Sequence, residues 1–211
     1  MRRATLLLLT ATITLAARGA AAPESVWSRL PRGIPADSLA PALRRLESAG
    51  PADVAGGAAY ALGQFHLARG EYHLAATAFG RAAARLQGIE RASARYRQGL
   101  AWLGEGEAAR ARAAFEEVAM LSESHRALSQ LGLAQCYALT GETDQELNVL
   151  RRLLDRPAGE AEPAALARYA ALCDRQHRTT EARAARERLA QRWPRSFEAA
   201  LLGAPEPAPK P

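Results

Sequence analysis

Residues 58–86 read AAYALGQFHLARGEYHLAATAFGRAAARL. Alanine and leucine recur at helical spacing before and after Gly70, which predicts two helices joined by a turn at that glycine. A chain that reverses direction between two helices needs a residue that tolerates left-handed backbone geometry, and glycine adopts it at little cost. The stretch therefore predicts a helix-turn-helix unit, and similar patterns follow it along the chain.

The predicted turns recur at a nearly constant interval. Gly106 and Gly141 follow Gly70 after 36 and 35 residues, and His177 occupies the equivalent place 36 residues after Gly141. This spacing predicts four repeats with a period of about 36 residues, as in helical repeat proteins. Their approximate bounds are 56–90, 91–125, 126–161 and 162–196.

The composition favours helices throughout the chain. Alanine, leucine, arginine and glutamate, all strong helix formers, are abundant. Runs of valine, isoleucine, threonine and aromatic residues in period-two alternation indicate strands. Such runs are absent from the sequence beyond its N-terminal apolar segment. We expect an all-α protein without a sheet.

The repeats resemble the tetratricopeptide repeat, which carries the pattern W-x2-L-G-x2-Y, then A-x3-F, then P. The first two units hold most of the matching glycines, alanines and phenylalanines. These residues are Leu62, Gly63, Ala75 and Phe79 in the first unit, and Gly99, Trp102, Gly106, Ala111 and Phe115 in the second. The resemblance implies an α-solenoid, a right-handed superhelix of antiparallel helix pairs.

The third and fourth units depart from this pattern. Glu146 and Leu150 replace the alanine and phenylalanine of the third unit, and Arg186 replaces the phenylalanine of the fourth. In the first two units, Gly63 and Gly99 are expected to let the paired helices approach closely. The two phenylalanines are expected to fill the space against the next unit.

The regions outside the repeats differ in composition. Residues 23–55 contain several prolines and a helical pattern at 38–49. We interpret this helix as a cap for the apolar end of the array or as the second helix of an incomplete repeat. Residues 197–203 predict a C-terminal helical stub. Residues 204–211 predict a proline-rich, extended tail that is a linker stub or a small recognition segment.

The N-terminal residues 1–22 have the organisation of a secretory signal. Arg2 and Arg3 precede an apolar run, and small residues at 19–22 suit cleavage. The alternative is a retained anchor, but a run of about fourteen apolar residues is short of the ~20 needed to span a bilayer. We predict export to the periplasm, with no membrane insertion of the mature chain.

The charge distribution argues against a nucleic-acid partner. The chain carries a net charge of +6, and three of its arginines lie in the predicted signal. The remaining arginines are mixed with glutamate and aspartate along the sequence. Nucleic-acid binding requires a clustered basic face, so we expect a solvated surface instead.

Patterns that indicate catalysis or metal binding are missing. No G-x-S-x-G, H-E-x-x-H, Walker or dinucleotide glycine motif occurs. The histidines, none of which forms a metal-ligand pair on one predicted helix, are His66, His73, His125 and His177. We predict no metal, no cofactor and no enzymatic activity.

The first helices of the units are expected to line the concave side of the superhelix. Their inward positions, counted from the turns, are Tyr60, Gln64 and Leu67, then Tyr96, Leu100 and Leu103, then Leu131 and Gln135, and in the fourth unit Ala167 and Ala171. Two tyrosines at the same repeat position suit peptide capture, because each offers a ring and a hydroxyl. The alternative is that both rings serve only packing, on each other and on Arg95 or Arg97.

The two cysteines occupy nearly equivalent positions in adjacent units. Cys136 and Cys173 are 37 residues apart, on the first helices of the third and fourth units. In an oxidising compartment they could form a disulfide. The alternative is a pair of reduced core residues, because helix faces need not present the Cβ separation that a disulfide requires.

Together these features predict an interaction scaffold of the bacterial envelope. We expect it to bind a protein or peptide partner, as a peptide or a helix, in its concave groove without catalysis. Two alternatives stay open: an accessory to a cell-wall-associated enzyme, and a structural array that assembles with itself.

Overall fold

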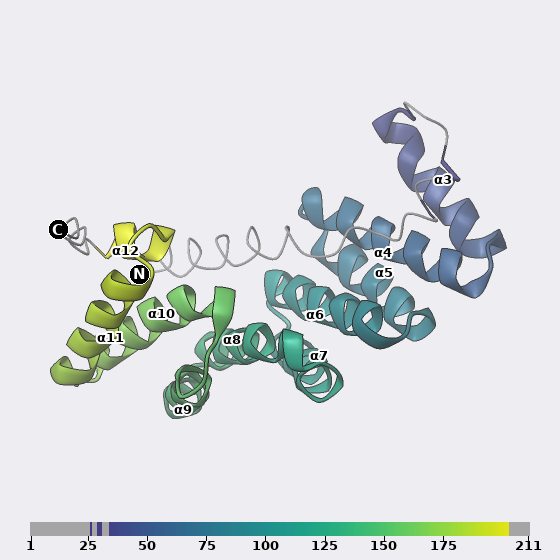
Figure 1. The fold of residues 1–211 in the computed structure, drawn as a ribbon. Helices are drawn as coiled ribbons and strands as arrows, with labels where there is room; N and C mark the ends of the chain where they lie inside the picture. The colour runs from purple at the N-terminus through teal and green to yellow at the C-terminus, as the bar shows by residue number, and fades with distance from the viewer. Residues whose placement is uncertain (1–25, 27–28, 31–33, 203–211) are drawn as a thin grey trace. The chain divides into compact units, whose positions relative to one another are not determined.

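The structure is a computed structural model that describes residues 26, 29–30 and 34–202. Over these residues the chain is helical and contains no strand, which confirms the all-α prediction (Figure 1). None of the helices in this part of the chain is long and apolar enough to cross a membrane. The predicted signal at 1–22 and the predicted tail at 204–211 lie outside the described residues.

Ten α-helices and one short 3-10 helix follow one another along the described residues. They are α3 (Ala36–Ala49), α4 (Ala52–Ala68), α5 (Tyr72–Arg85), α6 (Gly88–Glu105), α7 (Ala108–Leu121), α8 (Glu123–Thr140), α9 (Thr143–Leu154), η1 (Gly159–Ala161), α10 (Glu162–Arg175), α11 (Thr179–Arg192) and α12 (Phe197–Leu201). Short turns join α4 to α5, α6 to α7, α8 to α9 and α10 to α11, so the helices form four consecutive pairs.

Each of the four turns contains one residue in the left-handed region, as the sequence predicts. The φ angles are 72° at Gly70, 87° at Gly106, 79° at Gly141 and 59° at His177. In each turn the next amide donates to the carbonyl five residues earlier, at 2.8 to 2.9 Å. These bonds run from Glu71 to His66, from Glu107 to Trp102, from Glu142 to Tyr137 and from Arg178 to Cys173. One helix-ending geometry therefore serves all four pairs.

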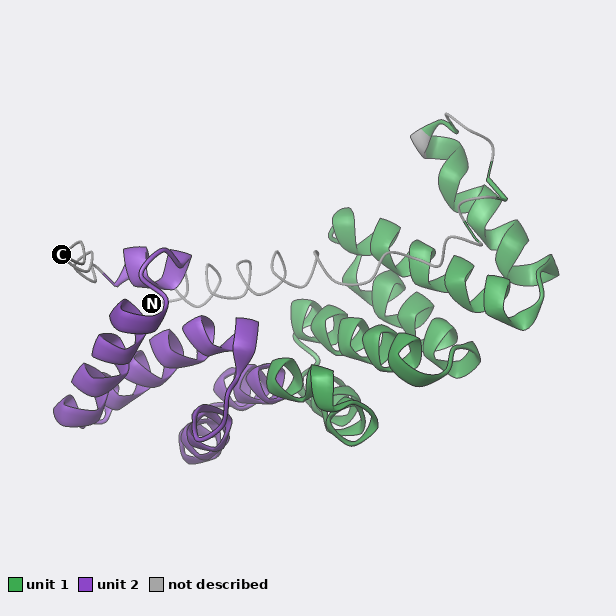
Figure 2. Cartoon of the chain, in the orientation of Figure 1, with its two compact units in different colours: residues 1–129 green, residues 130–211 purple. Residues whose placement is uncertain are grey.

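The chain forms two compact units, residues 1–129 and residues 130–211, and the division falls within α8 (Figure 2). We describe each by itself. Unit 1 contains α3 to α7, and unit 2 contains α9 to α12.

The core of unit 1 is built on two glycine–phenylalanine contacts. A Cβ atom on Gly63 would lie 2.6 Å from the ring of Phe79, and one on Gly99 would lie 2.7 Å from the ring of Phe115. Both rings are fully buried. The expected close approach of paired helices is confirmed. Each ring occupies the space that the glycine of its own pair leaves, and Phe79 also belongs to a core cluster that includes Ala94 and Ala101 of α6, the first helix of the next pair.

Helix α3 packs against α4 at the start of unit 1. Its Leu43 is fully buried, and its Glu47 carboxylate accepts hydrogen bonds from Arg81 on α5 at 2.6 and 3.1 Å. Helix α4 begins at Ala52, four residues before the start that the sequence predicts for the first repeat at residue 56. Pro51 precedes it with φ −58°, a conformation that suits a helix start.

Unit 2 contains ion pairs with buried glutamates, whereas the core of unit 1 contains the two buried phenylalanine rings. Glu146, at the alanine position of the third repeat, is 2 % exposed and accepts a hydrogen bond from Arg168 at 2.7 Å. Glu162, at the start of α10, is 1 % exposed and accepts from Arg188 at 2.6 Å and from Arg192 at 2.7 Å. Arg186, at the phenylalanine position of the fourth repeat, pairs with Asp174 near the surface. The sequence departures in these repeats thus mark a different core chemistry.

Candidate functional site

The predicted groove residues divide into a buried set and a partly exposed set. Of the eight groove residues predicted in the first three repeats, only Gln64 and Leu67 are partly exposed, and both lie on the last turns of α4. The buried members are Tyr60, Tyr96, Leu100, Leu103, Leu131 and Gln135. In the fourth repeat, Ala167 is buried and Ala171 is exposed.

The two tyrosines pack inside unit 1. The Tyr60 ring meets Phe79 edge-on at 5.4 Å, and the Arg97 guanidinium lies 5.7 Å from the Tyr60 ring centre. The Tyr96 ring lies 5.7 Å from Phe115. Burial raises the pKa of both hydroxyls, and at Tyr60 a hydrogen bond to Arg97 opposes that effect. These contacts belong to the packing role that the sequence leaves open as the alternative, and partner capture by these rings stays a prediction.

The accessible end of α4 carries apolar and charged groups together. Phe65 is partly exposed beside Gln64, and the Arg69 guanidinium lies 5.5 Å from the centre of its ring. Glu71 accepts a hydrogen bond from Arg69 at 2.9 Å and contacts His66 Nδ1 at 2.6 Å. The hydrogen bonds from His66 and Arg69 lower the pKa of the Glu71 carboxyl. This cluster anchors the turn at Gly70 and leaves the last turn of α4 partly exposed.

The disulfide that the sequence leaves open as one of two alternatives is absent between the two cysteines as the structure describes them, and its formation in an oxidising compartment stays a prediction. Cys136 and Cys173 are not joined by a disulfide, and both are buried. Burial raises the pKa of the Cys173 thiol, which also hydrogen-bonds with the Tyr169 hydroxyl. Each sulfur serves as a small core side chain of unit 2, the alternative that the sequence leaves open.

A polar cluster surrounds His125 at the start of α8. His125 Nε2 lies 3.1 Å from the Ser93 hydroxyl of α6, and its Nδ1 lies 3.0 Å from the Ser122 hydroxyl. Burial lowers the pKa of His125. The hydroxyls satisfy both ring nitrogens, so the cluster fastens the start of α8 to α6. No group of three or more potential metal ligands occurs in the described part of the chain.

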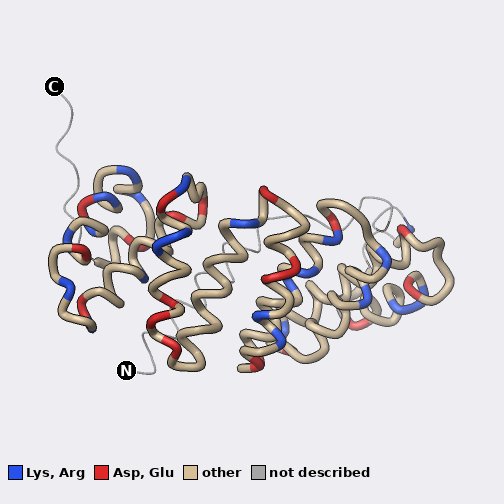
Figure 3. The backbone as a smooth tube through the Cα atoms, turned by 90° about the horizontal axis from the view of Figure 1, so that it is seen from below, with Lys and Arg blue, Asp and Glu red and all other residues tan. Residues whose placement is uncertain are grey.

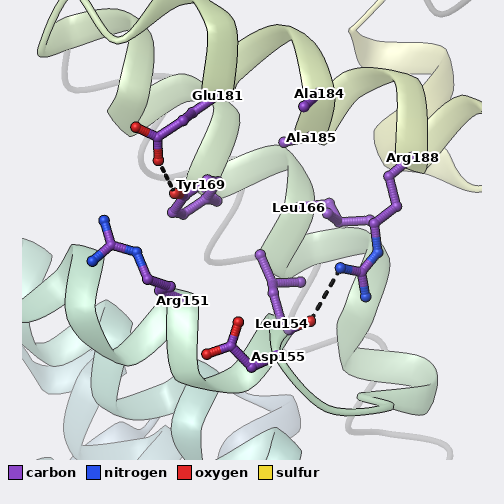
Figure 4. Close-up of a pocket in the computed structure, with 9 residues that line it drawn as sticks. All are labelled: Arg151, Leu154, Asp155, Leu166, Tyr169, Glu181, Ala184, Ala185 and Arg188. Atoms are coloured by element: carbon purple, nitrogen blue, oxygen red, sulfur yellow. Dashed lines mark hydrogen bonds between the residues drawn. The ribbon is translucent and has the colours of Figure 1, made fainter.

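Unit 2 contains a pocket of ≈ 260 Å³ that sequence reasoning missed (Figure 4). We call it the α9–α11 pocket. It is lined by Arg151 and Leu154 of α9, Asp155 at the C-terminal cap of α9, Leu166 and Tyr169 of α10, and Glu181, Ala184, Ala185 and Arg188 of α11. The connector between α9 and α10, residues 155–161, is longer than the connector 86–87 between α5 and α6. That insertion, with its proline and glycine, is the sequence signal that marks the place.

Charged side chains of both signs surround the pocket. The Tyr169 hydroxyl donates to Glu181 at 2.5 Å, and Arg178 donates to the same carboxylate at 2.7 Å. Burial and the hydrogen bond to Glu181 raise the pKa of Tyr169 to about 12, so the phenol stays protonated. The same two donors lower the pKa of Glu181. Arg188 donates to the Leu154 carbonyl at 3.0 Å (Figure 4).

Basic and acidic residues are interspersed along the backbone within each unit (Figure 3). Several of them form ion pairs between helices, such as Arg91 with Glu117 at 2.9 Å and Arg95 with the same carboxylate at 2.8 Å. The mixed distribution expected from the sequence is therefore present in the structure.

Comparison with known proteins identifies similar folds but no family model and no curated relative. No family model matches the sequence, and no curated protein matches it. Solved structures do match. The TPR-like repeats of a Podosopora anserina protein described as a putative kinesin light chain superpose with a TM-score of 0.60 at 16% identity, over 76% of this chain and 88% of that one. A single-substitution variant of the same repeats gives 0.61 at 15% identity, over 74% and 85%.

A third solved structure, PilF of Pseudomonas aeruginosa, spans nearly the whole chain. It matches with a TM-score of 0.54 at 16% identity, over 96% of this chain and 98% of its own. The chain has a tetratricopeptide-type fold. The α-solenoid class predicted from the sequence is thereby confirmed. In this tetratricopeptide-type fold, the contacts of Gly63 with Phe79 and of Gly99 with Phe115 are the packing that the repeat pattern encodes.

Proposed function

We propose that this chain is a protein-interaction scaffold, exported to the periplasm, that binds a peptide or a partner helix along its first helices. The observation that carries the proposal is the succession of four helix pairs with one turn geometry. Helical repeats of this kind present extended surfaces for binding, and they need no catalytic group to do so.

The last turns of α4 are the part of the predicted groove best suited to contact a partner. Leu67 and Gln64 are partly exposed there, and the ring of Phe65 is close by. Such a surface offers an aliphatic side chain, an amide and an aromatic edge to a peptide backbone. We assign a positioning role to the buried Tyr60 and Tyr96, which hold α4 and α6 against the phenylalanines of their own pairs.

A pull-down from envelope extract tests the binding proposal. The wild-type chain should retain a discrete partner, and the Leu67→Asp variant should lose it, because the charge disrupts an apolar contact. Leu74→Asp is the matched control, since Leu74 is 50 % exposed on α5 of the same pair. Equal retention by wild type and Leu67→Asp would exclude α4 as the contact surface.

The export proposal rests on the residue pattern of 1–22. It is tested by N-terminal sequencing of the protein recovered from a periplasmic fraction. We expect the mature chain to begin at Ala22 or Pro23, after cleavage in the small-residue region. Recovery of a chain that starts at Met1 would contradict cleavage.

A further inference from the structure

The α9–α11 pocket lies outside the residues that the proposed scaffold function uses. Its apolar floor consists of Leu154, Leu166, Ala184 and Ala185. A volume of ≈ 260 Å³ is below the ~300–1,000 Å³ of sites for drug-sized ligands. A ligand of one or two aliphatic side chains suits this size.

Hydrogen bonds hold both ends of the pocket in place. At one end, Arg188 donates to Glu162 at 2.6 Å and to the Leu154 carbonyl at 3.0 Å, which ties α11 to α9 and α10. At the other end, Glu181 of α11 accepts from Tyr169 of α10 at 2.5 Å. Binding to a pocket with fixed walls loses less conformational entropy than binding to one that must form.

These same bonds engage two of the four charged groups that line the pocket. Arg188 is neutralised by Glu162, and Glu181 is neutralised by Arg178. The remaining two are Arg151 on α9 and Asp155 at its C-terminal cap, both exposed. Neither forms an ion pair with the other or with any further residue that the structure describes, although Arg151 hydrogen-bonds with the Tyr169 hydroxyl and its positive charge helps to lower the pKa of Glu181.

Arg151 and Asp155 are four residues apart, and the Asp155 amide donates to the Arg151 carbonyl at 2.9 Å, which continues the helical geometry. Their side chains therefore leave the same face, with Cβ atoms about 5–6 Å apart. Two extended residues of a peptide span at most ~7 Å. The termini of an extended dipeptide are far enough apart for each to reach one of these two side chains, whereas the ammonium and carboxylate of a single amino acid are attached to one carbon and lie closer together.

We propose that the α9–α11 pocket binds a short zwitterionic peptide. Its α-carboxylate pairs with Arg151, its α-amino group pairs with Asp155, and an aliphatic side chain lies on the apolar floor. The guanidinium can hold a carboxylate with two parallel hydrogen bonds, and the exposed carboxylate of Asp155 accepts from an ammonium group. The proposal does not depend on partner capture by α4.

Leucyl-leucine is the probe, titrated into the full isotope-labelled chain while amide chemical shifts are recorded. We expect saturable shifts confined to α9, α10 and α11, with a Kd on the order of 0.1 to 1 mM for a ligand of this size. The same peptide with an acetylated N-terminus and an amidated C-terminus should bind at least about fivefold more weakly, because it lacks both charges.

Variants separate the charged contacts from the apolar floor. Asp155→Asn and Arg151→Gln should each weaken binding by roughly three- to fivefold, as expected for solvent-exposed ion pairs. Asp144→Asn and Arg152→Gln are matched controls on α9 that remove equivalent charges outside the pocket lining. Ala184→Phe should fill the pocket and weaken binding by at least about tenfold, with helicity checked by circular dichroism.

Any one of four results would overturn the proposal. The first is the absence of saturable shifts up to about 10 mM peptide, well above the expected Kd. The second is equal affinity for the capped and uncapped peptides. The third is unchanged affinity in the folded Ala184→Phe variant, and the fourth is unchanged affinity in both Asp155→Asn and Arg151→Gln. If Ala184→Phe does not fold, the two charge variants and their controls decide the outcome without it.

Discussion

The ring of Phe79 occupies the space where Gly63 would carry a Cβ atom, at 2.6 Å from the nearest ring carbon. The phenylalanine is fully buried, and α4 and α5 meet at this point. The glycine lies inside a helix, where it costs about 1 kcal/mol relative to alanine. Burial of the Phe79 ring in the space that the glycine leaves offsets this loss of helix stability.

We predict that Gly63→Ala destabilises the chain, because the buried ring or the helix must move. Overpacking of this kind costs about 1–3 kcal/mol, which exceeds the gain in helix propensity. Gly80→Ala is the control, since a Cβ atom there meets only the amide end of Gln98, a flexible side chain. Urea unfolding should show a lower midpoint for Gly63→Ala and an equal or higher one for Gly80→Ala. A stabilised Gly63→Ala would contradict the packing.

We predict that alanine substitutions at the same position of two repeats lower the free energy of unfolding by different amounts. Phe115→Ala removes a fully buried ring and should cost about 3–5 kcal/mol. Arg186→Ala, at the equivalent position of the fourth repeat, removes a surface ion pair with Asp174 and should cost less than about 1 kcal/mol. Chemical denaturation of both variants measures the difference. Equal losses would mean that Arg186 carries core packing that its exposure does not suggest.

The left-handed turn residues predict different effects on stability for two substitutions. Gly106→Ala places a Cβ atom at φ 87° and should cost about 1–2 kcal/mol. His177→Gly relieves the same strain at φ 59°, while the unfolded chain gains some freedom, so the net effect should lie within about 1 kcal/mol of zero. Thermal melts of the two variants distinguish these outcomes. A large loss for His177→Gly would assign a stabilising contact to the imidazole.

His125 predicts a pH dependence of stability. Burial lowers its pKa in the folded chain, so the folded state favours the neutral ring. Its contribution is therefore present above the unfolded pKa of about 6.5 and is lost as pH falls toward the folded value. Unfolding midpoints in urea at about pH 7.5 and pH 5.5 bracket this window, well above the ordinary carboxyl pKa values.

The control for this prediction is His125→Gln, which keeps a polar group near Ser93 but does not titrate. The wild type should lose stability on acidification across this window, and the variant should lose less. An identical loss in both proteins would show that another group is responsible.

The repeat architecture followed from sequence because it depends on local rules. The spacing of Gly70, Gly106 and Gly141 located three turns, and the period then located the fourth at His177, although histidine is an unusual residue there. Helix propensity and left-handed turn geometry act over a few residues, so a linear pattern contains them.

The candidate site was less predictable because burial depends on neighbours that are distant in the sequence. Counting from the turn glycine placed Tyr60 and Tyr96 on the first helices correctly, but it could not show that their rings lie against Phe79 and Phe115. Likewise, the pattern identified Glu146 as a departure from alanine without indicating that Arg168 neutralises it in the interior.

The sequence by itself determined the helices, their period and the positions of their turns, because each depends on residues within one or two helical turns of each other. Only the tertiary structure decided which side chains remain accessible. It buried the tyrosines and both cysteines, and it formed the α9–α11 pocket beside the long connector. The physical reason is that exposure, charge pairing and cavity volume depend on how separate helices meet in space, and no single helix encodes that geometry.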